Sequence, residues 1–137
     1  MASARPLPTV IGPTENALRA MLTRVLSSTR IPGYSAWVVL NAANAAGSDP
    51  HWRQRAADGL RTDLREVDEV LGHLRSAGLV DDAGTLTASG TAELTTARVA
   101  VTGTTVRLLE GIDETEQETT RRVLDAIRRR AEELLAA

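Results

Sequence analysis

The chain has 137 residues, enough for one domain with a hydrophobic core of its own. Its formal net charge is −2, so no basic excess points to a nucleic-acid partner, and it has no cysteine, which excludes a disulfide framework, a thiolate zinc site and a cysteine nucleophile. No apolar run approaches the roughly 18–20 residues that span a bilayer, and the first ten residues lack the apolar stretch of a secretory signal. We therefore expect a cytoplasmic protein without a membrane partner.

The first half of the chain has the pattern of three helices. Residues 1–12 form a proline-punctuated arm that we expect to be extended, and Pro13 resembles the start of a helix with a broad apolar face. A second helix is predicted from Tyr34 to Ala46. The segment Gly47 to Pro50 ends it and begins a short third helix, His51 to Asp58, because a capping Ser or Asp followed by proline favours a first helical turn.

The segment from Thr62 to Gly90 begins with a further predicted helix. Apolar residues recur there at helical spacing: Leu64, Val67, Val70, Leu71 and Leu74. Asp63 can cap this helix, Glu66 three residues later suits a capping box, and Gly78 can end the helix in a left-handed turn. The stripe of apolar residues indicates that one face of this helix packs on a core.

Two short strands are predicted after this helix. Leu79-Val80 and Thr85-Leu86-Thr87 flank a tight turn, Asp81 to Gly84, and another helix follows at once. Helix, short hairpin and helix make up the plan of a winged helix. We therefore expect residues 34–90 to form one winged helix-turn-helix unit with a short β-hairpin wing.

The last third of the chain predicts two long helices, from Thr91 to Leu109 and from Glu114 to Leu135, with Asp113 and Glu116 as a capping pair. Together with the first helix they carry more apolar surface than the winged unit can cover. We therefore expect a mainly α-helical homodimer in which these long helices form the interface around a two-fold axis. The alternative is that they fold back on their own subunit.

Four separate stretches of the chain form a further pattern. They are Tyr34–Leu40 (YSAWVVL), Leu74–Val80 (LRSAGLV), Leu86–Gly90 (LTASG), and Leu109–Asp113 (LEGID) followed by Arg122-Val123-Leu124. In this order the chain resembles the MarR family of transcriptional regulators. The resemblance implies a homodimer that binds a palindromic DNA operator through two winged units and is released by a small molecule. It implies a single domain over residues 1–137, with dimerisation helices at 13–30 and 91–137 and the winged helix unit at 34–90.

In the family the helix that follows Asp63 is the recognition helix, which meets DNA. Contacts to double-stranded DNA are expected from basic and hydroxyl side chains around this helix. The candidates are Arg53, Arg55, Arg61, Thr62 and Arg65. The outward face of that helix consists of Arg65, Glu69, Gly72 and Ser76. Residues 61–80 contain three Arg against four acids, and the wing has two acids and no Arg, so the family's wing contact does not carry over to this chain. The alternative is that these Arg are surface charges paired with Asp49, Asp58 and Asp63.

The three aromatic residues of the chain all lie between residues 34 and 52. In the family the ligand site lies between the winged unit and the dimer helices, and the resemblance implies a set of ligand-binding candidates: Tyr34, Trp37, Trp52 and His51. The alternative for Trp37 is a packed core residue.

No convincing catalytic constellation is present, because the chain lacks a Gly-rich phosphate loop, a nucleophile elbow and a metal-binding His pair. If the protein is an enzyme, the candidates are His51, His73 and Glu69, although His73 and Glu69 simply share i,i+4 spacing. No metal and no cofactor is expected. Two functions stay open: a ligand-responsive regulator, or a MarR-fold protein that has lost DNA binding and acts as a small-molecule-binding protein or repurposed enzyme in a biosynthetic pathway.

Overall fold

The computed structural model describes residues 5–137, and its secondary structure in that range is helical apart from one isolated β-bridge. The helices are α1 (Leu7–Leu26), α2 (Tyr34–Ala45), α3 (Trp52–Leu60), α4 (Leu64–Ser76), α5 (Ala88–Leu108) and α6 (Glu114–Ala136). The chain divides into two compact units, one ending at Thr102 and one from Gly103 to Ala137. No helix in the described range is long and apolar enough to cross a membrane. The predicted mainly α-helical class is confirmed.

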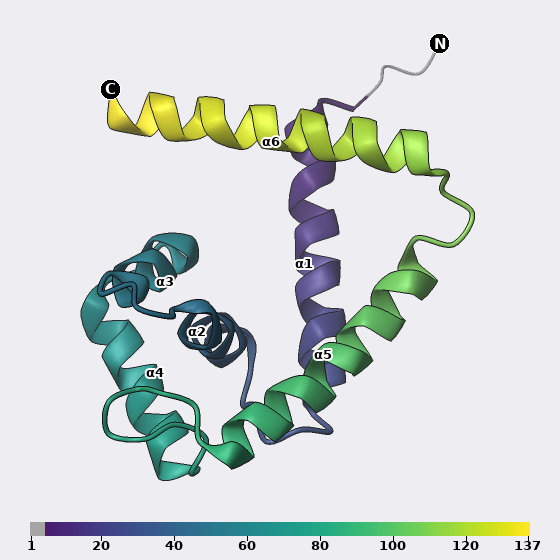
Figure 1. Cartoon of the computed structure of the whole chain (residues 1–137). Helices are drawn as coiled ribbons and strands as arrows, with labels where there is room; N and C mark the ends of the chain where they lie inside the picture. Colours follow the sequence, from purple (N-terminus) through teal and green to yellow (C-terminus); the bar gives the residue numbers. More distant parts are fainter. Residues whose placement is uncertain (1–4) are drawn as a thin grey trace. The chain divides into compact units, whose positions relative to one another are not determined.

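The core of the first unit lies among α2, α3 and α4, which pack against one another (Figure 1). Its largest fully buried side chains are Leu26, Leu40, Leu71, Leu74, Leu79, Val39 and Val67. Full burial of a side chain of this size stabilises the fold by about 1.5–3 kcal/mol. The apolar stripe of α4 therefore decides which face of that helix is left for solvent.

The first helix begins earlier than the sequence predicts. α1 starts at Leu7, so the expected extended arm is wrong for residues 7–12, and the first four residues lie outside the described range. Pro13 lies inside the helix rather than at its start. A proline there removes the N–H that would bond to the carbonyl of Thr9. Thr9 is exposed, so water can satisfy that carbonyl and the helix continues through the proline.

The second helix is confirmed to within one residue, whereas the third is shifted. α3 runs from Trp52 to Leu60, so Gly59 lies within it, and Arg61 supplies the left-handed turn with φ 55°. Backbone N–H groups of Arg61 and Thr62 bond back to Asp58 and Ala57 at 3.1 and 2.9 Å, which closes the helix end. A left-handed non-glycine residue costs roughly 1–2 kcal/mol, and these two bonds offset that cost.

The fourth helix, α4, has the predicted cap and end. The Asp63 carboxylate accepts the backbone N–H of Glu66 at 3.0 Å, and Gly78 has φ 78° just after the helix. The reciprocal bond from the Glu66 side chain does not form in the described chain, so the predicted capping box is only half present. Leu64 is 44% exposed, so the predicted buried stripe is wrong at its first position and begins at Val67.

The predicted β-hairpin wing is not confirmed, because the described residues contain no strand. A single antiparallel bridge joins Val80 to Leu86. The Asp81 carboxylate accepts the backbone N–H groups of Ala83 and Thr85 at 2.9 and 3.0 Å. These side-chain bonds close the turn, and backbone bonds from Asp81 to the carbonyl of Thr85 at 2.9 Å and from Thr87 to the carbonyl of Leu79 at 3.1 Å join its two sides. The wing, residues 81–85, is therefore a tight loop.

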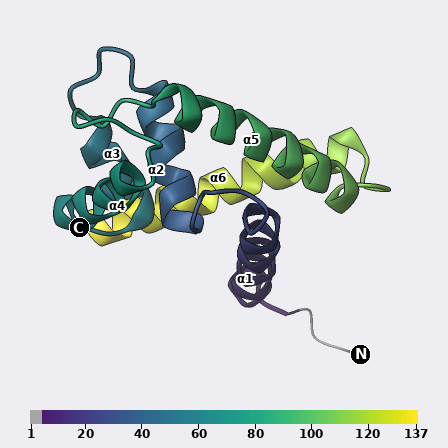
Figure 2. The ribbon, with the colours of Figure 1, turned by 90° about the horizontal axis from the view of Figure 1, so that it is seen from below.

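At the junction between the wing and α5, two stretches of backbone approach closely. A Cβ atom added at Gly90 would lie 1.9 Å from the carbonyl oxygen of Leu79. The Thr87 hydroxyl donates to the carbonyl of Gly78 at 2.6 Å and accepts the N–H of Gly90 at 3.0 Å. α5 starts at Ala88, three residues earlier than predicted, and its first turn lies against the backbone of Leu79. Figure 2 shows α5 continuing from the loop that follows α4.

The last helix has the predicted start. The Asp113 carboxylate accepts the N–H of Glu116 at 2.8 Å, and the Glu116 side chain accepts the N–H of Asp113 at 3.4 Å, which is a full capping box. α6 buries no residue in this chain. Its large apolar side chains Val123, Leu124, Leu134 and Leu135 are exposed.

The contact at Gly90 generates a stability prediction. We expect Gly90→Ala to lower the free energy of unfolding by at least about 2 kcal/mol, because a methyl group there overlaps backbone that cannot move aside. The matched control is Gly72→Ala in α4, where an added Cβ meets nothing within 4 Å. Ala is the better helix former, so the control should gain about 0.5–1 kcal/mol. Urea denaturation of both variants measures the difference, and equal midpoints would contradict the assigned contact.

Candidate nucleic-acid interface

The surface of α4 divides into a buried strip, an outward row opposite to it, and two flanks. Successive residues of a helix are about 100° apart, and the buried strip is Val67, Leu71 and Leu74. Opposite to it lies a row that we call the outward row: Arg65, Glu69, Gly72 and Ser76. Arg65 and Glu69 are exposed, and neither side chain makes a hydrogen bond or ion pair within the described chain. The outward row is therefore the part of α4 available to a partner.

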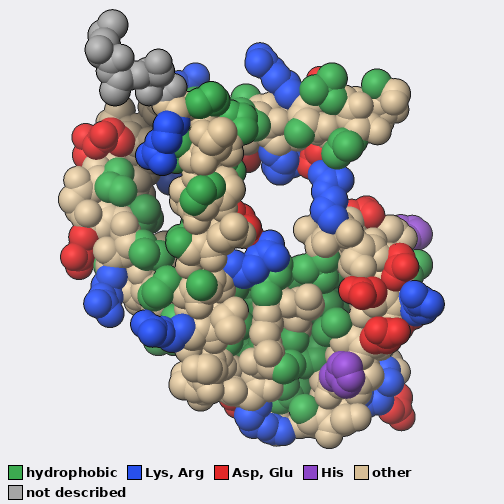
Figure 3. Space-filling model, turned by 180° about the vertical axis from the view of Figure 1, so that it is seen from behind, with side chains coloured by type: hydrophobic (Ala, Val, Ile, Leu, Met, Phe, Trp, Pro, Cys, Tyr) green, Lys and Arg blue, Asp and Glu red, His purple; other side chains and the backbone are tan. Residues whose placement is uncertain are grey.

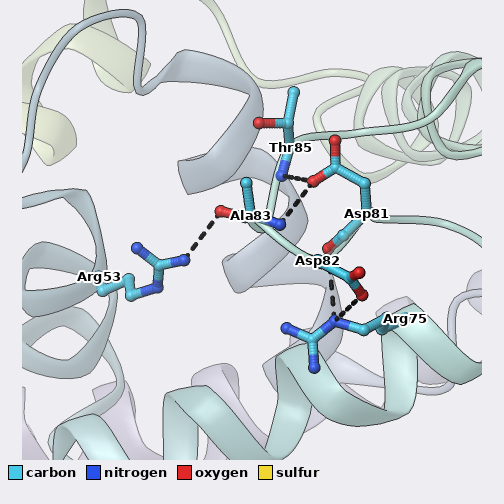
Figure 4. A network of polar contacts seen from close by, with 6 residues as sticks. All are labelled: Arg53, Arg75, Asp81, Asp82, Ala83 and Thr85. Carbon is cyan, nitrogen blue, oxygen red and sulfur yellow. Dashed lines mark hydrogen bonds and ion pairs between the residues drawn. The ribbon is translucent and has the colours of Figure 1, made fainter.

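Two arginines, one from α3 and one from α4, hold the wing beside one flank of α4 (Figure 4). Arg75, near the end of α4, donates through Nε to the carbonyl of Asp81 at 3.4 Å and lies 3.6 Å from the Asp82 carboxylate. Arg53 of α3 donates through Nη2 to the carbonyl of Ala83 at 3.0 Å. Both guanidinium groups are thus aimed at the wing loop.

Arg53 also joins three elements of the winged unit. Its guanidinium lies 4.8 Å from the ring centre of Trp52, its Nε lies 3.9 Å from the Asp68 carboxylate of α4, and its Nη2 would lie 2.8 Å from a Cβ at Gly84. Gly84 has φ 82°, so the wing turn needs a glycine both for its backbone and for this close approach. Arg53 is thus engaged inside the unit, although it was predicted as a DNA contact.

The other predicted DNA contacts lie around the start of α4. Arg55 is 74% exposed in its side chain and pairs with Asp49 at 2.7 Å. Arg61 is exposed and makes no side-chain bond in the described range, and Thr62 is half-buried. Of the alternative ion pairs considered from the sequence, the described chain forms Arg55–Asp49. Asp58 instead accepts from Gln54, and Asp63 caps α4.

A cavity of about 300 Å³ lies on the opposite flank of α4, within the first unit. Its lining is Arg19, Tyr34, Ser35, Gly59, Leu60, Arg61, Thr62, Glu66 and Val70. The Arg19 guanidinium lies 4.4 Å from the Tyr34 ring centre, and its Nη2 lies 2.6 Å from the Glu15 carboxylate. We call it the Arg19 pocket. It combines an aromatic face with two cations, which suits a small aromatic anion.

The predicted ligand residues separate in space. Tyr34 lines the Arg19 pocket, whereas Trp37, Trp52 and His51 do not. Trp37 is half-buried against the core, Trp52 is 9% exposed, and His51 is exposed. Sequence reasoning missed Arg19, because α1 meets α2 only through the tertiary fold and no local pattern marks that contact.

The three catalytic candidates do not gather in either cavity next to Tyr34. His73 lines a second, shallower cavity of about 260 Å³, and neither that cavity nor the Arg19 pocket is lined by His51 or Glu69. Glu69 lies in the outward row. Within residues 5–137, no group of three or more His, Asp or Glu side chains could hold a metal ion.

Comparisons with known proteins identify the fold. No protein-family model matches the chain, and no curated protein matches it. Among solved structures, the transcriptional regulator PA3341 is 24% identical with a TM-score of 0.77, covering 93% of this chain and 99% of that one. The Mycobacterium tuberculosis MarR family protein Rv2887 is 23% identical, covering 90% of this chain and 98% of that one. Its TM-score is 0.71 in complex with DNA and 0.69 in complex with salicylic acid. The chain therefore has the fold that the resemblance implied.

Proposed function

We propose, from a fold shared with MarR-family transcriptional regulators, that this protein is a ligand-responsive regulator that binds a palindromic DNA operator as a homodimer. The observation that carries the proposal is the outward row of α4, an exposed helix face beside a complete helix-turn-helix made by α3 and α4. In such a motif the second helix enters the major groove, and residues near its N-terminus contact base edges. Rv2887, which has this fold, is described in complex with DNA.

The cations around the start of α4 supply the phosphate contacts of this proposal. Arg61 and Thr62 precede the helix and can reach phosphates, whereas Arg65 lies in its first turn, where residues contact base edges. Arg55 is exposed enough to exchange Asp49 for a phosphate, since exposed ion pairs are worth only about 0–1 kcal/mol. Arg53 contributes indirectly by holding the wing. Phosphate contacts of this kind fix the register of the protein on DNA without specifying sequence.

Uncovered apolar side chains support the homodimer. Large exposed hydrophobic residues follow one another through the end of α5, the connecting turn and α6: Val99, Val106, Leu108, Leu109, Ile112, Val123, Leu124, Leu134 and Leu135. Figure 3 shows hydrophobic side chains at the surface of α6 among its charged ones. An exposed apolar surface of this extent is typical of an interface. We propose residues 13–30 and 91–137 as the dimerisation helices and 34–90 as the winged unit.

The Arg19 pocket supports a small aromatic acid as the ligand. Rv2887 is described in complex with salicylic acid. In this chain Arg19 can exchange Glu15 for the carboxylate of a ligand, with the ligand ring against Tyr34, while Glu66 is the one lining acid that opposes an anion. Arg61, Thr62 and Glu66 belong both to the pocket and to the start of α4. A ligand there would displace the residues that meet DNA, which links occupancy to release.

A second function is favoured by the charges of α4. Glu66, Asp68 and Glu69 place three acids on the helix that should approach a polyanion, and Arg53 and Arg75 are engaged with the wing. A protein of this fold that has lost DNA binding would keep the Arg19 pocket as its functional site. That candidate predicts that the gene lies in a biosynthetic cluster and that its deletion accumulates an intermediate while transcript levels stay unchanged.

The regulator predicts a salt-dependent gel shift. We expect the dimer to bind an inverted repeat upstream of its own gene. Arg61→Ala should lower the slope of log affinity against log salt by about one for each phosphate that the variant no longer neutralises, and Arg65→Ala should weaken binding to the inverted repeat. Arg24→Ala, on α1, is the matched control and should bind as the parent does. A micromolar dimer that gives no shift on this DNA at low salt excludes the regulator.

The pocket predicts ligand binding that depends on Arg19. Salicylate, measured by titration calorimetry, should bind the parent protein, and Arg19→Ala should weaken it about tenfold or more, because the variant cannot form a charge-assisted hydrogen bond. Arg24→Ala again serves as the control for removal of a cation from α1. Equal salicylate affinity of the two variants would remove the pocket from the proposal.

The uncovered helices predict a stable dimer in sedimentation equilibrium. The double variant Leu134→Glu and Leu135→Glu should shift the protein towards monomer, because its two most exposed leucines on α6 would carry charge into the interface. Arg129→Glu, on the other side of α6, should leave the dimer intact. A parent protein that sediments as a monomer at micromolar concentration refutes the proposed use of these helices.

A further inference from the structure

The outward row of α4 contains two charged side chains of opposite sign, four residues apart. We propose that these two residues specify bases in the operator: Arg65 bonds to a guanine, and Glu69 accepts a hydrogen bond from the N4 amino group of a cytosine. The inference rests on the proposed DNA-binding function and adds the residue that sets part of its sequence preference. It gives an acid on a DNA-facing helix the role of a specificity determinant.

The other acids of α4 are directed elsewhere. Asp68 lies on the wing flank, 3.9 Å from Arg53, and Glu66 lines the Arg19 pocket on the opposite flank. Glu69 alone among them lies on the side opposite the buried Val67, Leu71 and Leu74. A helix that enters a groove with its outward row therefore brings one carboxylate to the bases.

The Glu69 carboxylate forms no ion pair with Arg65, its neighbour in the outward row, within the described chain. Arg65 and Glu69 have the i,i+4 spacing of a helical ion pair, yet no ion pair forms between them in the described chain. The order Arg then Glu is also the less favourable one for such a pair along a helix. Both side chains are therefore available for separate base contacts.

The chemistry of the major groove selects cytosine for a carboxylate. Guanine presents two acceptors there and thymine presents one, so both repel Glu69. Adenine presents a donor beside an acceptor, whereas cytosine presents the N4 donor alone. Guanine is in turn the base that accepts two bonds from Arg65.

The helix geometry sets the spacing of the two bases. Four residues rise about 6 Å along α4, which is close to two base-pair steps of about 3.4 Å. Gly72 follows Glu69 in the row, and a Cβ there would meet nothing within 4 Å, so the helix carries no bulk at that turn. Each half-site should thus contain a guanine and a cytosine about two base pairs apart, and the second half-site should repeat them in inverted order.

The test is selection of bound duplexes from a randomised pool by the full-length dimer at low salt, followed by sequencing. The parent should prefer cytosine about tenfold at one position of each half-site. Glu69→Ala should abolish that preference, and Glu69→Gln should change it to adenine, because an amide matches the adenine donor and acceptor. Arg65→Ala should remove the guanine preference at a different position. Asp82→Asn, on the wing, controls for the removal of one negative charge and should keep both preferences.

Each other outcome overturns the inference in a distinguishable way. If Glu69→Ala binds all sequences more tightly with unchanged preferences, Glu69 only repels phosphates. If it alters the same position as Arg65→Ala, Glu69 orients Arg65 and contacts no base. If the parent binds no duplex at all, the proposed regulator function fails and takes this inference with it.

Discussion

The contact of Gly90 with the carbonyl of Leu79 is the constraint on which the rest of the first unit depends. It lets α5 begin directly on the backbone that follows α4, where any side chain would hold the two apart. Further bonds then join α5 to the winged unit. Arg98 donates to the Asn41 side chain of α2 at 2.6 and 2.9 Å, and Glu93 accepts the N–H of Arg30 at 2.7 Å. The start of α5 and the helix α4 are therefore parts of one packed body.

The wing has a structural role in this protein. Arg53 and Arg75 donate to carbonyl groups of the wing, and the Asp81 side chain closes its turn. The loop is therefore held by α3 and α4 and by its own side chain. Arg53 and Arg75, two of the cations near the candidate interface, are therefore bonded to the wing. The other arginines around the start of α4 are Arg61 and Arg65, both exposed, and they lie beside the acids Asp63 and Glu66.

Local signals predicted the elements that local physics determines. The periodicity and Asp63 cap of α4, the left-handed Gly78 and the capping box of α6 all depend on residues within one or two turns. The start of α1 was wrong because Pro13, which favours a first helical turn, lies inside a helix that begins at Leu7. The β-hairpin is not confirmed, because a single antiparallel bridge, Val80 to Leu86, joins its two sides. The Arg19 pocket could not be predicted, because α1 and α2 come together only in the tertiary fold. The roles of the predicted DNA and ligand residues remain predictions.

The central proposal is that α4, and not the wing, contacts DNA. Hydrogen–deuterium exchange of the full-length dimer, with and without a bound operator duplex, tests it most directly. We expect DNA to slow exchange in residues 61–76 and to leave residues 81–85 unchanged, because the wing is held by Arg53 and Arg75 on its own side. Protection of residues 81–85 with no change along α4 would contradict it.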